Sequence, residues 1–304
     1  MRFDKACPVI FDNDDPRDCY SDEFMMAAAS LGEIDCKGII TTSSHDPYNS
    51  HVPEKEMDDF HPEKLRNRDL AAQSGLKRLP EFFCGVKGNL EQPASGKPED
   101  TRPIDTPGSR RIMEVARGCT PEKPLVILVG GPVSTVVDAW LLDKSIADKM
   151  IVAFHEFSDD YAINGYNSWA DGWASVTAFQ KLRMVRYYSV HHNSIEYDPE
   201  VPKERLKREI PECPLKPEMV AKDHPHNVLP DERDVDCVPG IHFMRDDYVL
   251  ESRRQSFSHT DKKEGHIIPV LKDDPDGNTV FVTKMNRSVA TEEWWRVMKT
   301  ALRT

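Results

Sequence analysis

Short apolar runs alternate with amphipathic segments along the first two thirds of the chain, and this alternation predicts strands followed by helices. The first run, residues 8–11, ends at Asp12, as expected of a buried parallel strand whose carboxyl end carries polar function. Ser21 is predicted to cap a helix that continues to Leu31, and residues 34–42 predict a second strand. The chain therefore opens with a β-α-β unit of a length that suits two parallel strands.

The same pattern continues to the end of the chain. Further strands are predicted at 82–86, 124–129, 150–154, 184–190, 267–271 and 279–282, and helices at 56–76, 109–116, 133–142, 171–182 and 291–302. The turn residues 273–277 predict a hairpin between the last two strands. We expect one α/β domain over residues 1–304, built on a single doubly wound, mostly parallel sheet with helices on both faces.

Residues 193–233 interrupt this pattern. They are polar and rich in proline, lysine and glutamate, which indicates a surface insertion. Within them, the charged run 203–222 is predicted to be a solvated face.

The charge and the cysteines exclude several classes of protein. A formal net charge of −12 disfavours binding to nucleic acid and to anionic membranes. The most apolar window, 125–142, is interrupted by a Gly-Gly-Pro sequence and by Asp138, so we expect a strand, a loop and a helix there instead of a membrane span. The seven cysteines include no Cys-x-x-Cys pair, which argues against a disulfide framework and a structural zinc site. A cytoplasmic location is expected.

An acidic cluster follows the first strand. Five aspartates occur within eleven residues: Asp12, Asp14, Asp15, Asp18 and Asp22. Ligands bind beyond the carboxyl ends of strands in open α/β sheets, and carboxylates crowded there repel one another unless a cation offsets them. A hard divalent ion, Ca²⁺ or Mg²⁺, fits such oxygen ligands. The alternative is an acidic loop that caps a helix and is only solvated.

A strand followed by Asp-x-Asp, more aspartates and a helix resembles the signature of the nucleoside hydrolase family, of the inosine-uridine preferring type. Other segments are similar to motifs of this family in the same order, and the spacing is closest to a divergent bacterial branch. These segments are 38–42 (Gly-Ile-Ile-Thr-Thr), 129–135 (Val-Gly-Gly-Pro-Val-Ser-Thr), 142–147 (Leu-Asp-Lys-Ser-Ile-Ala), 166–174 (Tyr-Asn-Ser-Trp-Ala-Asp-Gly-Trp-Ala) and 292–296 (Glu-Glu-Trp-Trp-Arg).

The resemblance implies hydrolysis of the N-glycosidic bond of a ribonucleoside by a calcium-bound water. It also implies a homodimer or homotetramer, and a small-molecule nucleoside as the partner. Asp14 would be general base and metal ligand, supported by Asp12. The further metal ligands would be Asp22, the carbonyl of Gly130 and Asp236, with Asp234 and Asp231 as alternatives to Asp236. Substrate would be bound by Asp18, Asn167, Trp169 and His155. The leaving-group acid is not identified, and the histidines considered for it are His155, His191, His192 and His242.

Two other functions fit parts of the sequence. In a haloacid dehalogenase-like phosphatase, Asp12 would attack phosphorus and Asp14 would act as acid and base. Pro16 stands where that motif has Thr or Val, which argues against it. The second is a catalytically altered relative that only binds a ligand, because Ser21 and Gly165 stand where the nucleoside hydrolase pattern has Asp and Glu.

Overall fold

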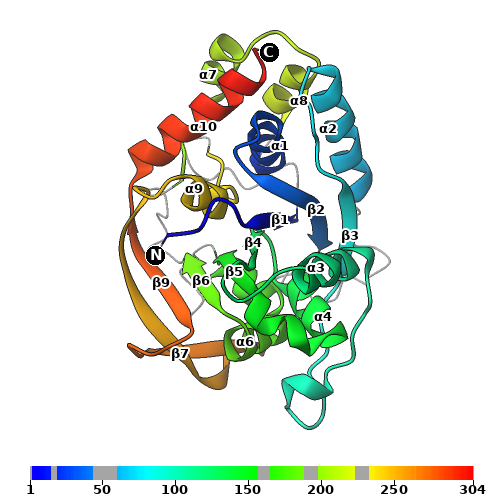
Figure 1. Ribbon diagram of the computed structural model, residues 1–304, viewed down its shortest axis with the longest axis vertical. Coiled ribbons are helices and arrows are strands. Elements are labelled where there is room, and N and C mark those ends of the chain that lie inside the picture. Colours follow the sequence, from blue (N-terminus) through cyan, green and yellow to red (C-terminus); the bar gives the residue numbers. More distant parts are fainter. Residues whose placement is uncertain are drawn as a thin grey trace.

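The computed structural model describes residues 2–14, 19–43, 60–156, 165–187, 198–222, 233–263 and 265–303. Within them, nine strands form one sheet in the order β3-β2-β1-β4-β5-β6-β9-β7-β8 (Figure 1). The strands are β1 (Pro8–Asn13), β2 (Asp35–Ser43), β3 (Phe82–Lys87), β4 (Leu125–Val129), β5 (Met150–His155), β6 (Met184–Tyr187), β7 (Val249–Lys263), β8 (His266–Asp273) and β9 (Thr279–Met285). Strands β1 to β6 and β9 pair in parallel, and β7 is antiparallel to its neighbours β9 and β8.

Helices cover both faces of this sheet, which confirms the predicted doubly wound α/β architecture (Figure 1). Successive residues of a strand point to opposite faces. Phe11 therefore packs in the core under α1, α9 and α10, whereas Ile10 packs in the core under α3, α4 and α6. The helices are α1 (Ser21–Leu31), α2 (His61–Gln73), α3 (Pro107–Arg117), α4 (Ser134–Leu142), α5 (Tyr166–Ala170), α6 (Gly172–Lys181), α7 (Lys203–Glu209), α8 (Leu215–Ala221), α9 (Val238–Met244) and α10 (Arg287–Ala301), with 3-10 turns η3 (Pro98–Asp100) and η4 (Lys144–Lys149).

Local sequence accounts for several of the helix starts. The side chain of Asp171 accepts a hydrogen bond from the backbone N–H of Ala174 and so caps α6, which lies within the helix predicted at 171–182. Ser21 does not cap α1; it is the first helical residue, and no side chain caps this helix. No helix in the described ranges combines the length and the apolar character needed to cross a membrane.

The charged run 203–222 has a second, buried face that the prediction of a solvated face did not include. It forms α7 and α8, and Leu206, Leu215 and Met219 are fully buried in the same core as α1 and α10. The acidic and basic residues between these apolar positions concealed two short amphipathic helices. That residues 193–233 are an insertion stays a prediction.

The predicted hairpin is wrong. Both of its strands exist, as β8 and β9, but the sheet order places β7 between them. Strand β7 pairs with β8 through residues 255–263 and with β9 through residues 249–255. Its sequence is mostly polar and exposed, so it gives no apolar signal that would predict a strand.

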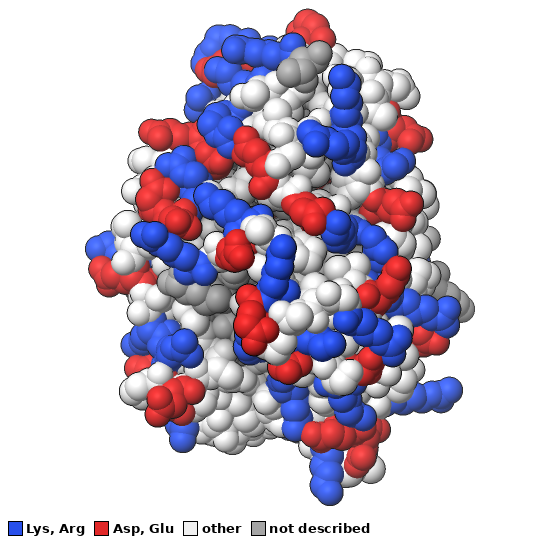
Figure 2. Space-filling view, viewed as in Figure 1, with Lys and Arg blue, Asp and Glu red and all other residues white. Residues whose placement is uncertain are grey.

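Charges of both signs are mixed over the surface. On the face in Figure 2, Lys and Arg side chains alternate with Asp and Glu, and neither sign forms a large continuous patch.

Candidate functional site

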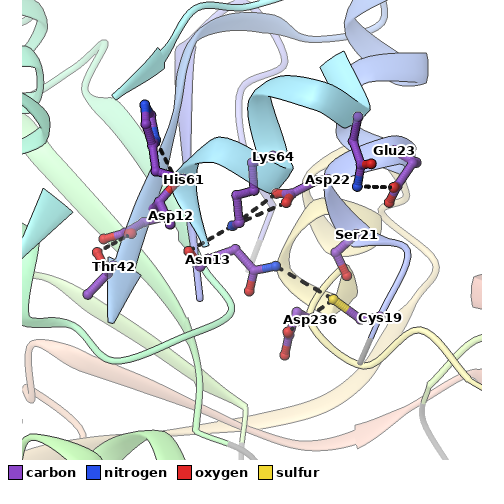
Figure 3. Close-up of polar contacts among 12 residues, drawn as sticks. Asp12, Asn13, Cys19, Ser21, Asp22, Glu23, Thr42, His61, Lys64 and Asp236 are labelled. Carbon is purple, nitrogen blue, oxygen red and sulfur yellow. Dashed lines mark hydrogen bonds and ion pairs between the residues drawn. The ribbon is translucent and has the colours of Figure 1, made fainter. Parts of the chain in front are cut away.

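Acidic and amide side chains gather where β1 ends and α1 begins (Figure 3). Asp12 and Asn13 are the last two residues of β1, and Asp22 and Glu23 lie in the first turn of α1. All four residues are buried, with at most 2% of their surface exposed. Because a buried charge costs several kcal/mol unless it is paired, the contacts of these groups determine what the site can do.

Asp12 is held by the hydroxyl of Thr42, which in turn contacts the hydroxyl of Thr135. The Thr42 hydroxyl donates to Asp12 Oδ1 at 2.5 Å, and Thr135 Oγ1 accepts from the backbone N–H of Val86. Burial raises the pKa of Asp12 to about 8, although the hydrogen bond from Thr42 and the charge of Lys64 lower it. Asp12 is therefore mostly protonated at pH 7. In the described part of the chain its second oxygen, Oδ2, has no hydrogen-bond partner.

The loop after β4, which contains Gly130 and Gly131, packs closely against the acidic residues of the site. A Cβ atom at Gly130 would lie 2.5 Å from Asp236 Cβ and 2.6 Å from Asn13 Oδ1, and one at Gly131 would lie 2.9 Å from Asp14 Cγ. Only glycine allows approaches this close. The Gly130–Gly131 pair thus lets Asn13, Asp14 and Asp236 come together from distant parts of the sequence.

Asp236 is buried next to other acidic side chains of the site. Burial, followed by the negative charges of Asp14 and Asp234, raises the pKa of Asp236 well above its usual range. The thiol of Cys19 donates to Asp236 Oδ2 at 3.4 Å, and His155 Nδ1 lies 3.7 Å from Asp236 Oδ1. Burial lowers the pKa of His155, so its imidazole is neutral at pH 7.

Two buried lysines balance part of this negative charge. Lys64, on α2, donates from Nζ to the Asn13 carbonyl at 2.9 Å and lies 3.1 Å from Asp22 Oδ2 (Figure 3). Lys222, after α8, lies 2.8 Å from Glu23 Oε1 and donates to the Cys19 carbonyl at 2.7 Å. Sequence reasoning missed both lysines, since each stands in a polar segment that reads as solvated.

Asp234, an alternative metal ligand from the sequence, is engaged in the core. Its Oδ1 accepts hydrogen bonds from the Ser21 hydroxyl and from the Tyr20 backbone N–H, and its Oδ2 accepts one from Trp294 Nε1 at 2.7 Å. Burial raises the pKa of Asp234 to about 6, against the hydrogen bonds from Ser21 and Trp294. Asp236 is thus the better placed of the two, and Asp231 lies outside the described residues.

Of the residues predicted to bind substrate, Asn167 and His155 contact residues of the site, and Trp169 contacts β8. The Asn167 amide donates to the carbonyls of Gly130 and His155, which ties the loops after β4 and β5 together. His155 lies beside Asp236, whereas Trp169 packs edge-on against His266 with ring centroids 4.4 Å apart. The substrate roles of these three residues stay predictions.

His242 is buried in the core, where it contacts the Tyr187 hydroxyl and the ring of Phe3. Asp18, His191 and His192 lie outside the described residues.

In the described part of the chain, three of the expected calcium ligands are engaged by protein donors, an arrangement that does not fit a calcium ion. The Lys64 ammonium lies at Asp22, the Gly130 carbonyl accepts the Asn167 amide, and Asp236 accepts the thiol of Cys19. Among the described residues, no three His, Cys, Asp or Glu side chains are grouped as a metal would require. Calcium therefore stays a prediction from the resemblance.

Comparisons with known proteins show similarity in fold, and not in sequence. No family model matches the sequence, and no curated protein matches it significantly. Among solved structures, an inosine-guanosine nucleoside hydrolase has a TM-score of 0.62 at 14% identity, covering 97% of this chain and 98% of its own. A plant nucleoside hydrolase has a TM-score of 0.61 at 13% identity, with 97% and 98% covered. A purine-preferring ribonucleoside hydrolase from Gardnerella vaginalis has a TM-score of 0.61 at 12% identity, with 97% and 99% covered. The chain thus has a nucleoside hydrolase-like α/β fold along almost its whole length.

Proposed function

We propose that this protein hydrolyses the N-glycosidic bond of a ribonucleoside, giving ribose and a free base. The observation that carries the proposal is the convergence of Asp12, Asn13 and Asp14 with Asp236 on the Gly130–Gly131 loop. This convergence occurs at the carboxyl end of β1, where an open α/β sheet binds its ligands, in a chain that shares its fold with nucleoside hydrolases.

In this proposal Asp14 is the general base. It takes a proton from a water molecule, whose oxygen attacks the anomeric carbon while the bond from that carbon to the base breaks. The electron pair leaves with the base, which takes a proton from solvent, and Asp14 later returns its proton to solvent; the transition state resembles an oxocarbenium ion. Asp14 is partly exposed, so it can meet a water molecule, whereas Asp12 is fully buried. No step is assigned to a metal ion.

In this proposal Asp12, which is fully buried, has a supporting role and does not touch the attacking water. Its Oδ1 accepts a hydrogen bond from Thr42, and a proton on Oδ2 would make the neutral carboxyl group a hydrogen-bond donor in this proposal. A phosphatase that used Asp12 as nucleophile would need this carboxyl group ionised and accessible. Its burial and its raised pKa favour the hydrolase instead.

The test is release of free base from a panel of purine and pyrimidine ribonucleosides, measured by chromatography, with a phosphatase reporter alongside. Asp14→Asn should lower kcat by about 100-fold or more, because general-base catalysis contributes at least that much. Asp69→Asn, at an exposed position on α2, is the matched control and should retain full activity. Phosphate release without base release would contradict the proposal. So would a protein that binds nucleosides but releases no base from any of them.

A further inference from the structure

Lys64 is buried at the centre of the acidic site. Its side chain is fully buried, and its Nζ lies between the carbonyl at the end of β1 and the carboxylate in the first turn of α1 (Figure 3). The ammonium is 2.9 Å from the Asn13 oxygen and 3.1 Å from Asp22 Oδ2. A lysine is rarely found at such a position unless oxygen ligands surround its charge, because removing an ammonium from water costs several kcal/mol.

The Lys64 ammonium places a positive charge among the acidic side chains of the site, where a bound cation would otherwise offset their negative charge. Its positive charge also acts on the carboxyl groups of Asp12 and Asp236. The other buried lysine nearby, Lys222, is paired with Glu23, on the side of α1 toward α8. Lys64 is therefore the cation that faces Asp12, Asp22 and Asp236 among the described residues.

Helix α2 holds the Lys64 ammonium in position through two contacts with α1. Lys64 and Asn67 are three residues apart and lie on one face of α2, as this spacing requires. Asn67 Nδ2 donates to Glu23 Oε1 at 3.2 Å, so α2 binds the acidic first turn of α1 at two successive residues, Asp22 and Glu23. This second contact fixes the register of α2 and with it the position of the ammonium.

We propose that the Lys64 ammonium takes the place of a divalent metal ion in this site, as a cation built into the chain that holds Asp22 and the end of β1 in position. The inference deepens the proposed function, since it makes the same site independent of added metal. Its central measurement is metal binding without substrate, so that its failure is distinguishable from a failure of the hydrolase proposal.

The first experiment titrates calcium and magnesium into the wild-type protein, by calorimetry and by thermal melting with and without chelator. We expect no heat of binding and no change in Tm, and an unchanged rate of base release in chelator wherever activity is found. Stoichiometric calcium binding that raises the Tm and is abolished by Asp22→Asn would overturn the inference. This measurement decides the question even if variants of Lys64 do not fold.

The second experiment removes the ammonium. Lys64→Met should lower the Tm in chelator, and millimolar calcium should restore several degrees of it, because the acids then lack their own cation. Lys222→Met, the matched control, removes another buried charge, that beside Glu23, and this variant should lose stability that calcium does not restore. A Lys64→Met protein whose Tm does not respond to calcium, or an equal response in both variants, would show that Lys64 does not stand in for a metal.

Discussion

The stability of this protein should depend on pH through Asp12. Its carboxyl group is fully buried, and burial raises its pKa from 3.8 to about 8. Between these two values the folded protein holds a proton that the unfolded chain has released, so stability contributed by this group is complete below pH 4 and is lost as the pH rises toward 8. One unit of pKa shift corresponds to about 1.4 kcal/mol, and the group alone lowers the free energy of unfolding by about 2 kcal/mol between pH 6 and pH 8.

Asp12→Asn isolates this contribution. An asparagine keeps an oxygen that can accept the hydrogen bond from Thr42, but it does not ionise. We therefore expect the wild-type protein to lose about 2 kcal/mol more than the variant between pH 6 and pH 8. Urea denaturation at four pH values from 5 to about 8 measures this difference, and the other acids of the site cancel because both proteins carry them. Parallel dependences on pH in the two proteins would refute the reasoning.

Two further substitutions test the packing around the site. Gly131→Ala places a methyl group 2.9 Å from Asp14 Cγ, so the rate of base release should fall roughly 10- to 100-fold. The control Gly118→Ala, at an exposed position, should leave this rate unchanged, and equal rates in the two variants would count against the close approach of Asp14. Trp294→Phe removes the indole N–H that donates to the buried carboxylate of Asp234. Guanidinium denaturation should show the free energy of unfolding fall by about 1–3 kcal/mol, and a loss below about 0.5 kcal/mol would show that this hydrogen bond is dispensable.

The fold could be predicted where apolar patterns are uninterrupted. The strands around Ile10, Ile127 and Val152 are buried on both faces, and their sequences show it as continuous apolar runs. Strand β7 could not be found in this way, because its side chains are mostly exposed and it is held by backbone pairing with β8 and β9. Without β7, the two strands beside the turn at 273–277 were bound to be read as a hairpin.

The site could be predicted only as far as local sequence specifies it. The position of Asp12 and Asp14 at the carboxyl end of the first strand follows from the strand pattern, and Asp22 follows from the start of α1. Lys64 could not be predicted, because its burial depends on how α2 packs against α1, which a single polar helix sequence does not encode. The same holds for the thiol of Cys19, which reaches Asp236 across 217 positions of the chain.

The most direct test of the central claim follows the oxygen atom of the attacking water. The protein is incubated with reactive ribonucleosides in water enriched in ¹⁸O, and the products are analysed promptly by mass spectrometry. The account predicts one heavy oxygen in the released ribose and none in the base, with both products depending on Asp14. Release of base without label in the ribose, or intact nucleosides after prolonged incubation with a folded protein, would contradict it.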